Sequence, residues 1–232
     1  MTEPLLIGTH GWEHPAWHGS FYPPELPLDW RFCFYSNRLR SVLVSAESWR
    51  VTDDTQTRLW RADCDPQFRF VLELPAVLTT PTLPEIFDGH WADFRAHIEP
   101  LHGHIAGLLM RLPVTAAPDR DSLAHALSVL TAYKPVSVDL PIAPWRTHAL
   151  STLLADAGAG LCWHADTAAA PQPGGRFMVG LTAGGNAKTL RHQIESLSTW
   201  QHADSLAGLF IQPPGSARMA EEARIIAEIL GK

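Results

Sequence analysis

Eight short apolar runs recur along the chain, and longer amphipathic segments separate them. The runs are rich in Val, Ile, Leu or Phe, and they cover residues 5–8, 41–46, 68–74, 105–112, 136–140, 160–165, 177–182 and 207–212. Continuous apolar runs of this length are typical of parallel strands that are buried on both faces. The pattern therefore predicts a parallel sheet with helices between its strands.

The amphipathic segments predict seven helices, over residues 27–39, 53–62, 83–101, 119–133, 144–157, 188–200 and 217–230. The connection after the sixth run, residues 167–175, is rich in Pro, Gly and Ala, so we expect a loop in place of a helix there. Eight strands that alternate with helices predict a single-domain (β/α)₈ barrel of the TIM type over residues 1–232. An open doubly wound sheet is the alternative, but the turn GTHGWEH does not match the GxGxxG pattern of that fold.

Composition narrows the functional classes. Of the 232 residues, 46% are hydrophobic and 18% charged, which excludes a disordered chain. No apolar run approaches the ~18 residues of a membrane helix, and the opening MTEPLLIGTHGW has no secretory pattern. The net charge of −6 argues against nucleic acid as a partner. Three cysteines without a CxxC pair indicate a reducing, cytoplasmic setting and no thiolate zinc site.

The carboxyl ends of the predicted strands point to a site. Active sites of (β/α)₈ barrels lie at these ends, and here polar residues close each run. Glu73 and Asp139 lie inside the apolar runs FVLELP and VSVDLP, where a carboxylate is costly unless it is paired or functional. We expect them to be a catalytic acid and base, with Arg111 as their charge partner. A purely structural pair with Arg111 is the alternative.

Further residues at the same end are candidates for binding a small-molecule ligand. They are His10, Trp12, Trp17, Glu47, His164, Asp166 and Gln212. Five of the nine tryptophans lie near this end: Trp12, Trp17, Trp49 and Trp145 follow predicted strands, and Trp163 lies near the end of the sixth. Flat aromatic walls with a few polar groups suit a sugar, a base or another ring compound. Packing of the loops is the other explanation for these tryptophans.

Phosphate and a divalent metal ion are two further candidate ligands. The segment TAGGNAKT after the seventh run predicts a weak phosphate site at Gly184, Gly185 and Lys188, because glycine amides before a helix can face an anion. The carboxylates could hold a divalent metal together with His10 or His164. No HExxH spacing supports a metal, so we predict no metal ligands and leave the cofactor open.

The stretch IGTHGWEHPAWHGSFYPP, residues 7–24, resembles the opening IGTSGWxYxxWxGxFYPP of the domain-of-unknown-function family number 72, DUF72. FRFVLELP, LLMRLP and VDLPIAPW are weaker matches in the same order along the chain. The resemblance implies a TIM-like barrel and no established reaction.

The chain also departs from this family. Where the family reads VEINSTFY, residues 42–49 read VLVSAESW; the family's third-strand Lys is Glu73, and the Arg after its fifth-strand acid is Pro141. We therefore expect a divergent member. The leading hypothesis is an enzyme of hydrolase or isomerase type that acts on a small polar ring compound. The alternative is a non-catalytic binding or regulatory protein on a degenerate barrel, and the oligomeric state stays open.

Overall fold

The computed structural model describes residues 3–80, 83–114, 119–140 and 147–232. Its strands are β1 (Leu6–His10), β2 (Ser41–Val44), β3 (Arg69–Glu73), β4 (Ile105–Arg111), β5 (Val136–Asp139), β6 (Gly160–Leu161), β7 (Trp163–His164), β8 (Phe177–Thr182) and β9 (Leu206–Ile211). Its α-helices are α1 (Arg31–Ser36), α2 (Asp54–Asp63), α3 (Pro84–Ile98), α4 (Arg120–Tyr133), α5 (His148–Asp156), α6 (Ala187–Trp200) and α7 (Ala217–Ile229). Short 3₁₀ helices are η1 (Pro15–Trp17), η2 (Leu28–Trp30), η3 (Ala46–Arg50), η4 (Ala76–Leu78) and η5 (Glu99–His104).

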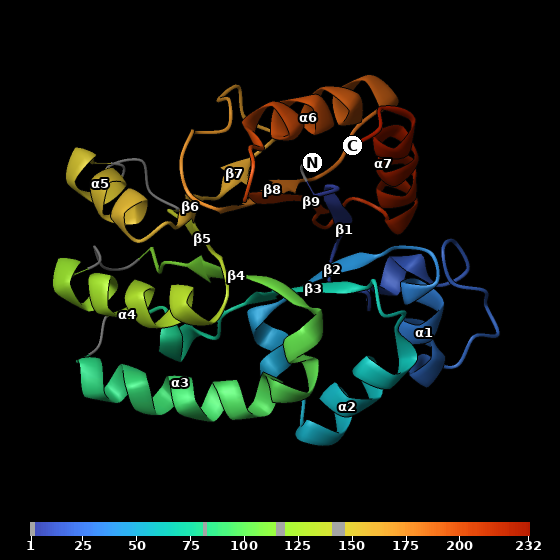
Figure 1. Ribbon diagram of the computed structural model, residues 1–232. Helices are drawn as coiled ribbons and strands as arrows, with labels where there is room; N and C mark the ends of the chain where they lie inside the picture. Colours follow the sequence, from blue (N-terminus) through green and yellow to red (C-terminus); the bar gives the residue numbers. More distant parts are fainter. Residues whose placement is uncertain (1–2, 81–82, 115–118, 141–146) are drawn as a thin grey trace.

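The strands form one parallel sheet in the order β6-β5-β4-β3-β2-β1-β9-β8-β7. The sixth predicted strand, 160–165, is divided in two at Cys162: β6 pairs with β5, whereas β7 pairs with β8. One stretch of chain thus joins the two ends of the sheet, and the barrel is nearly closed. The predicted (β/α)₈ architecture is confirmed, with helices around a central set of strands (Figure 1).

A glycine allows the two ends of the sheet to approach. A Cβ on Gly160 would lie 2.0 Å from the carbonyl oxygen of Phe177, the first residue of β8. No other residue fits between the backbones of β6 and β8 at this distance, because real Cβ contacts never come so close.

The helices follow the sequence pattern with shorter bounds. The helix predicted over 27–39 is α1 alone, preceded by η2, and α3 ends at Ile98, where η5 replaces the last predicted turn. The predicted start of the fifth helix, at residue 144, lies outside the described residues. No helix follows β7: the chain runs from β7 to β8 as a loop, as the Pro/Gly-rich composition of residues 167–175 predicts (Figure 1).

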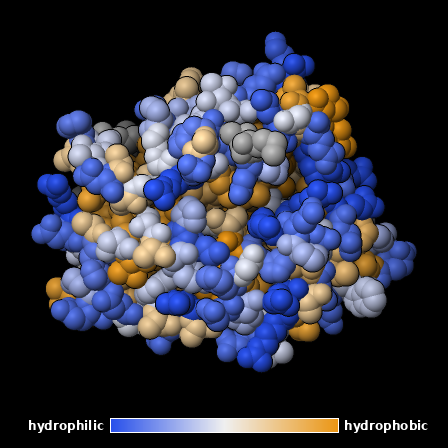
Figure 2. Space-filling model, in the orientation of Figure 1, coloured by the Kyte–Doolittle hydropathy of each residue, from blue (hydrophilic) through white to orange (hydrophobic). Residues whose placement is uncertain are grey.

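Helix α7 covers β1 and β9 with small side chains. Ala217, Ala220, Ala223 and Ala227 are buried, whereas Ile229 is 79% exposed. Figure 2 shows a mainly hydrophilic face, with hydrophobic residues gathered at the upper right, where α7 lies in Figure 1. Among the described residues, no helix is both long and apolar enough to cross a membrane.

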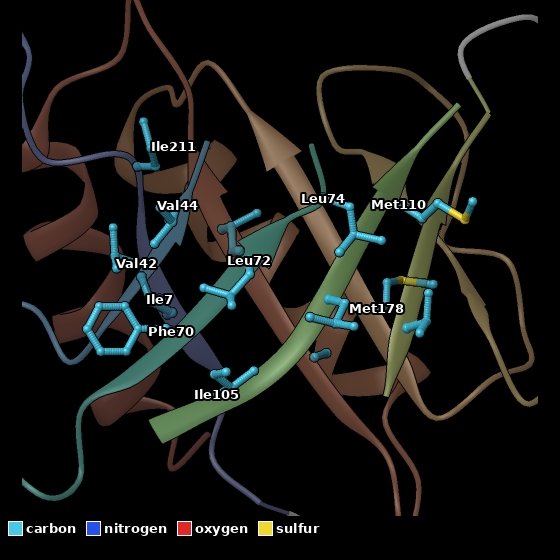
Figure 3. Packing of buried hydrophobic residues seen from close by; sticks show 14 of the residues in the cluster. Ile7, Val42, Val44, Phe70, Leu72, Leu74, Ile105, Met110, Met178 and Ile211 are labelled. Carbon is cyan, nitrogen blue, oxygen red and sulfur yellow. The ribbon is translucent and has the colours of Figure 1, made fainter. Parts of the chain in front are cut away.

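Side chains on the strands alternate between two cores. Leu43, Val71 and Leu109 point into the barrel, where they pack with Phe177 and Phe210. Their neighbours point outward to the helices, as Val42, Phe70 and Leu72 do in Figure 3. Because this alternation has period two, it also decides which residue at the end of each strand faces the barrel mouth.

The first and last strands differ slightly from prediction. Strand β1 extends to His10, so this histidine ends the strand rather than following it. Gly8 pairs with Phe210, and Thr9 with Ile211, so Gln212 lies two positions beyond the partner of Gly8. Gln212 therefore lies near the carboxyl end of β1.

Candidate active site at the carboxyl ends of the strands

Five side chains at the carboxyl ends of the strands form one chain of contacts, here called the mouth network. Its members are His10, Glu73, Arg111, Asp139 and His164. Each is the last residue of its strand, and inward-pointing Val71, Leu109 and Ser137 stand two positions before three of them. The barrel therefore gathers residues that are more than 150 positions apart.

The mouth network alternates between basic and acidic groups. His10 Nε2 lies 2.9 Å from Glu73 Oε2, and Glu73 Oε1 lies 3.5 Å from Arg111 Nε. Arg111 Nε lies 3.3 Å from Asp139 Oδ2, and Asp139 Oδ1 lies 2.9 Å from His164 Nε2. One guanidinium thus serves both carboxylates, and each carboxylate has its own histidine.

Burial differs along the mouth network. The side chains of Glu73 and Asp139 are 9% and 4% exposed, whereas that of His164 is 39% exposed. Arg111 Nε and Nη2 are buried and form no hydrogen bond within the described structure. The guanidinium therefore interacts with the carboxylates through charge alone, and part of its donor capacity is unused.

A cavity of about 450 Å³ opens beside His10. Trp12, Phe32 and Trp60 supply aromatic surface to its lining, with ring centroids of Trp12 5.0 Å from Phe32 and 4.8 Å from Trp60. Ser45, Ser48, Thr52, Gln56, Asp29 and His14 supply polar groups. His10 is the member of the mouth network that lines this cavity, so it connects the cavity to the buried carboxylates.

The other tryptophans have packing contacts. Trp17 is buried against Phe21 and Tyr22 and does not line the cavity beside His10. Trp49 donates its indole N–H to the carbonyl oxygen of Glu73 at 2.8 Å, and Trp163 donates to the carbonyl oxygen of Ala169. Trp145, like Pro141, lies outside the described residues.

Three predicted ligand-binding residues lie apart from the mouth network. Asp166 is exposed and accepts hydrogen bonds from Thr182 Oγ1 and the amide of Ala183, both at 2.7 Å. It thereby ties the end of β7 to the end of β8. Glu47 is exposed on η3, and Gln212 is half-buried just after β9.

Two amides of the glycine loop between β8 and α6 already donate hydrogen bonds within the chain. The amide of Gly184 donates to Thr182 Oγ1 at 2.9 Å, and the amide of Ala183 is taken by Asp166. Asn186 caps α6 by accepting from the amide of Thr189. Gly185 and the exposed Lys188 lie in this loop and at the start of the helix.

Asp139, Cys162 and His164 offer ligand atoms within 4.8 Å of one another. These are residue types that bind zinc. However, Arg111 lies 3.3 Å from Asp139, and its fixed positive charge opposes a second cation at this carboxylate. The set therefore fits a metal poorly.

The sequence signals missed two walls of the cavity. Phe32 and Trp60 come from α1 and α2, and their sequence pattern is that of ordinary core residues in amphipathic helices. Only the packing of these helices against the loop after β1 brings both rings to Trp12. Nothing in their spacing identifies this role.

Comparisons with solved structures agree with the fold of the chain. A DUF72 family protein from Thermotoga maritima is similar over 98% of this chain and 100% of its own, with a TM-score of 0.70 and 15% identity. One from Enterococcus faecalis has a TM-score of 0.71 and 12% identity, over 98% of this chain and 96% of its own. D-psicose 3-epimerase from Clostridium cellulolyticum, solved with D-tagatose, has a TM-score of 0.54 and 10% identity, over 98% of both chains.

No curated protein matches the sequence. The family described as "Protein of unknown function DUF72" matches residues 6–231, almost the whole chain. This protein therefore belongs to the DUF72 family.

Proposed function

We propose that this protein is an acid–base enzyme of isomerase or hydrolase type, acting on a small polar ring compound at the barrel mouth. The observation that carries the proposal is the hydrogen bond between His10 and Glu73 at the edge of the aromatic cavity. A histidine beside a carboxylate can take and return a proton near neutral pH. The cavity volume lies within the range of small-molecule sites, ~300–1,000 Å³.

Each residue has a role in this proposal. The ring of the substrate lies against Trp12, and His10 exchanges a proton with it, while Glu73 orients the imidazole and stabilises its charged form. Arg111 lies between Glu73 and Asp139, and its guanidinium is close enough to attract a developing negative charge. Asp139 and His164 are a second pair on the other side of Arg111, and its histidine is more exposed than His10.

The similarity to D-psicose 3-epimerase, solved with D-tagatose, suggests monosaccharides as the first compounds to test. At 10% identity this similarity shows the fold alone, so the choice of substrate rests on analogy. The aromatic wall and the hydroxyl and amide groups of the cavity suit such a ring.

A direct test is exchange of substrate hydrogen with solvent. We expect NMR in D₂O to show deuterium entering a carbon-bound position of a ketose or aldose when the protein is present. Glu73→Gln and His10→Gln should slow this exchange by roughly 10²–10⁴-fold, the usual contribution of a general acid or base. Glu25→Gln, an exposed change outside the mouth, is the matched control and should leave the rate unchanged.

The second candidate function is ligand binding without catalysis. It is favoured by Arg111, which contacts both buried carboxylates and so can neutralise them permanently. Saturable sugar binding without hydrogen exchange or hydrolysis of a glycoside panel would support this candidate and contradict an enzyme.

A further inference from the structure

A second large cavity, here called the base cavity, lies at the opposite end of the barrel from the mouth network. Its volume is about 1060 Å³, and the starts of β1, β2, β3, β4 and β9 contribute to its lining. Between this base cavity and the mouth lie the fully buried side chains of the barrel interior, including Leu43, Val71 and Phe177. The two ends of the barrel are therefore separate compartments.

The base cavity is basic although the protein is acidic. Five of its lining residues are basic: Arg40, Arg69, Arg176, Arg224 and Lys232. Three are acidic: Glu3, Asp204 and Glu228. Since the whole chain has a net charge of −6, this surplus of positive charge is a local feature.

Most of these arginines have no carboxylate partner within the described part of the chain. Arg224 pairs with Glu228, whereas Arg69 donates only to the carbonyl oxygens of Pro66 and Phe68. Arg40 and Arg176 make no ion pair there and are exposed at the cavity. Lys134 lies near this group of arginines. Its pKa is lowered mainly by burial and, to a smaller extent, by the positive charge of Arg69.

Two buried donors in the lining residues lack partners. Arg224 Nε and Ser41 Oγ are buried and form no hydrogen bond within the described structure, and Ser41 as a whole is only 1% exposed. A buried polar group without a partner is costly, so natural proteins retain few of them. These two atoms are closed to solvent, so the donors that a ligand in the cavity can reach are the exposed guanidinium groups of Arg40 and Arg176.

From this geometry we propose that the base cavity binds a small organic anion that carries phosphate groups. Guanidinium groups suit phosphate because their planar N–H donors match its oxygens. The cavity is far larger than a single inorganic ion needs, which indicates an organic ligand. This site is independent of the catalytic function proposed for the mouth.

Pyrophosphate and citrate, compared by titration calorimetry at constant ionic strength, test the proposal. We expect saturable binding of pyrophosphate that is tighter than that of citrate. The double variant Arg40→Gln, Arg176→Gln should weaken pyrophosphate binding by about ten-fold or more, because it removes two unpaired guanidinium groups. Neither residue makes an ion pair in the described structure, so the variant should keep the wild-type melting temperature.

Two controls locate the effect. Arg58→Gln, an exposed arginine outside the cavity, controls for overall charge, and His164→Gln, at the exposed end of the mouth network, controls for binding at the mouth. Both should retain wild-type pyrophosphate affinity. The proposal fails if pyrophosphate does not saturate, if His164→Gln abolishes binding, or if Arg58→Gln weakens it as much as the double variant. Tighter binding of citrate would overturn the assignment to phosphate.

Discussion

At the scale of single residues, the main question is whether Glu73 and Asp139 are catalytic groups or a structural pair with Arg111. Both carboxylates are almost fully buried, and both face one guanidinium nitrogen of Arg111. A structural pair that loses one partner leaves an uncompensated buried charge, which costs roughly 3 kcal/mol or more. Here, however, Arg111 contacts both carboxylates. When one of them is replaced by an amide, the guanidinium remains paired with the other.

We therefore expect that Glu73→Gln and Asp139→Asn, made separately, leave the free energy of unfolding unchanged or increase it. Active-site charges are commonly kept for function at the expense of stability. Denaturant titration of the two variants beside the wild type measures the effect. Losses of about 3 kcal/mol in both would identify a structural pair and favour the non-catalytic barrel.

At the scale of elements, closure of the barrel depends on the divided sixth strand. β6 and β7 contain two residues each, so few hydrogen bonds join the ends of the sheet. Gly160 adds a steric condition, because its Cα faces the backbone of Phe177 without room for a Cβ. Closure thus depends on a position where only glycine fits.

Gly160→Ala should therefore destabilise the protein by about 2 kcal/mol or more, since the backbones of β6 and β8 must move apart. Gly89→Ala is the matched control: Gly89 lies in the exposed face of α3, and a Cβ added there would meet no atom within 4 Å. This change should raise stability by roughly 0.5–1 kcal/mol, because alanine favours a helix. Equal thermal shifts in both variants would contradict the steric account.

At the scale of the whole molecule, buried phenols and a thiol link stability to alkaline pH. Burial is the main cause that raises the pKa of Tyr22 and Tyr35 well above the ordinary value near 10. Burial also raises the pKa of Tyr133 to about 12 and that of Cys64 to about 11. The folded protein therefore holds protons that the unfolded chain releases at lower pH.

Because these pKa values are higher in the folded state, their stabilising contribution is complete below about pH 8.5 and is lost as pH rises. We expect the melting temperature to fall steadily from about pH 9 to about pH 11. Tyr35→Phe removes one such group and should make the fall shallower. It should also lower stability at neutral pH, because Tyr35 Oη bonds to Thr9 and to the carbonyl oxygen of Ser41. An unchanged alkaline slope in this variant would contradict the assignment.

The barrel and most of the mouth network follow from local patterns that a sequence displays. Continuous apolar runs indicate buried parallel strands, and the carboxylates inside FVLELP and VSVDLP mark Glu73 and Asp139. The opening motif identifies the family, which the match over residues 6–231 confirms. These features depend on neighbouring residues alone, so they can be recognised without coordinates.

Only the tertiary structure decided which of the polar strand ends meet. Period-two alternation turns His10, Glu73, Arg111, Asp139 and His164 toward one another, while the loop geometry after β7 directs Asp166 to Thr182. The sequence also did not indicate that Phe32 and Trp60 line the cavity beside His10. It did not indicate the register between β1 and β9, or the basic cavity at the base of the barrel. The physical reason is that contacts between distant segments depend on strand register, helix packing and closure of the sheet. These are properties of the whole chain, and no stretch of it encodes them separately.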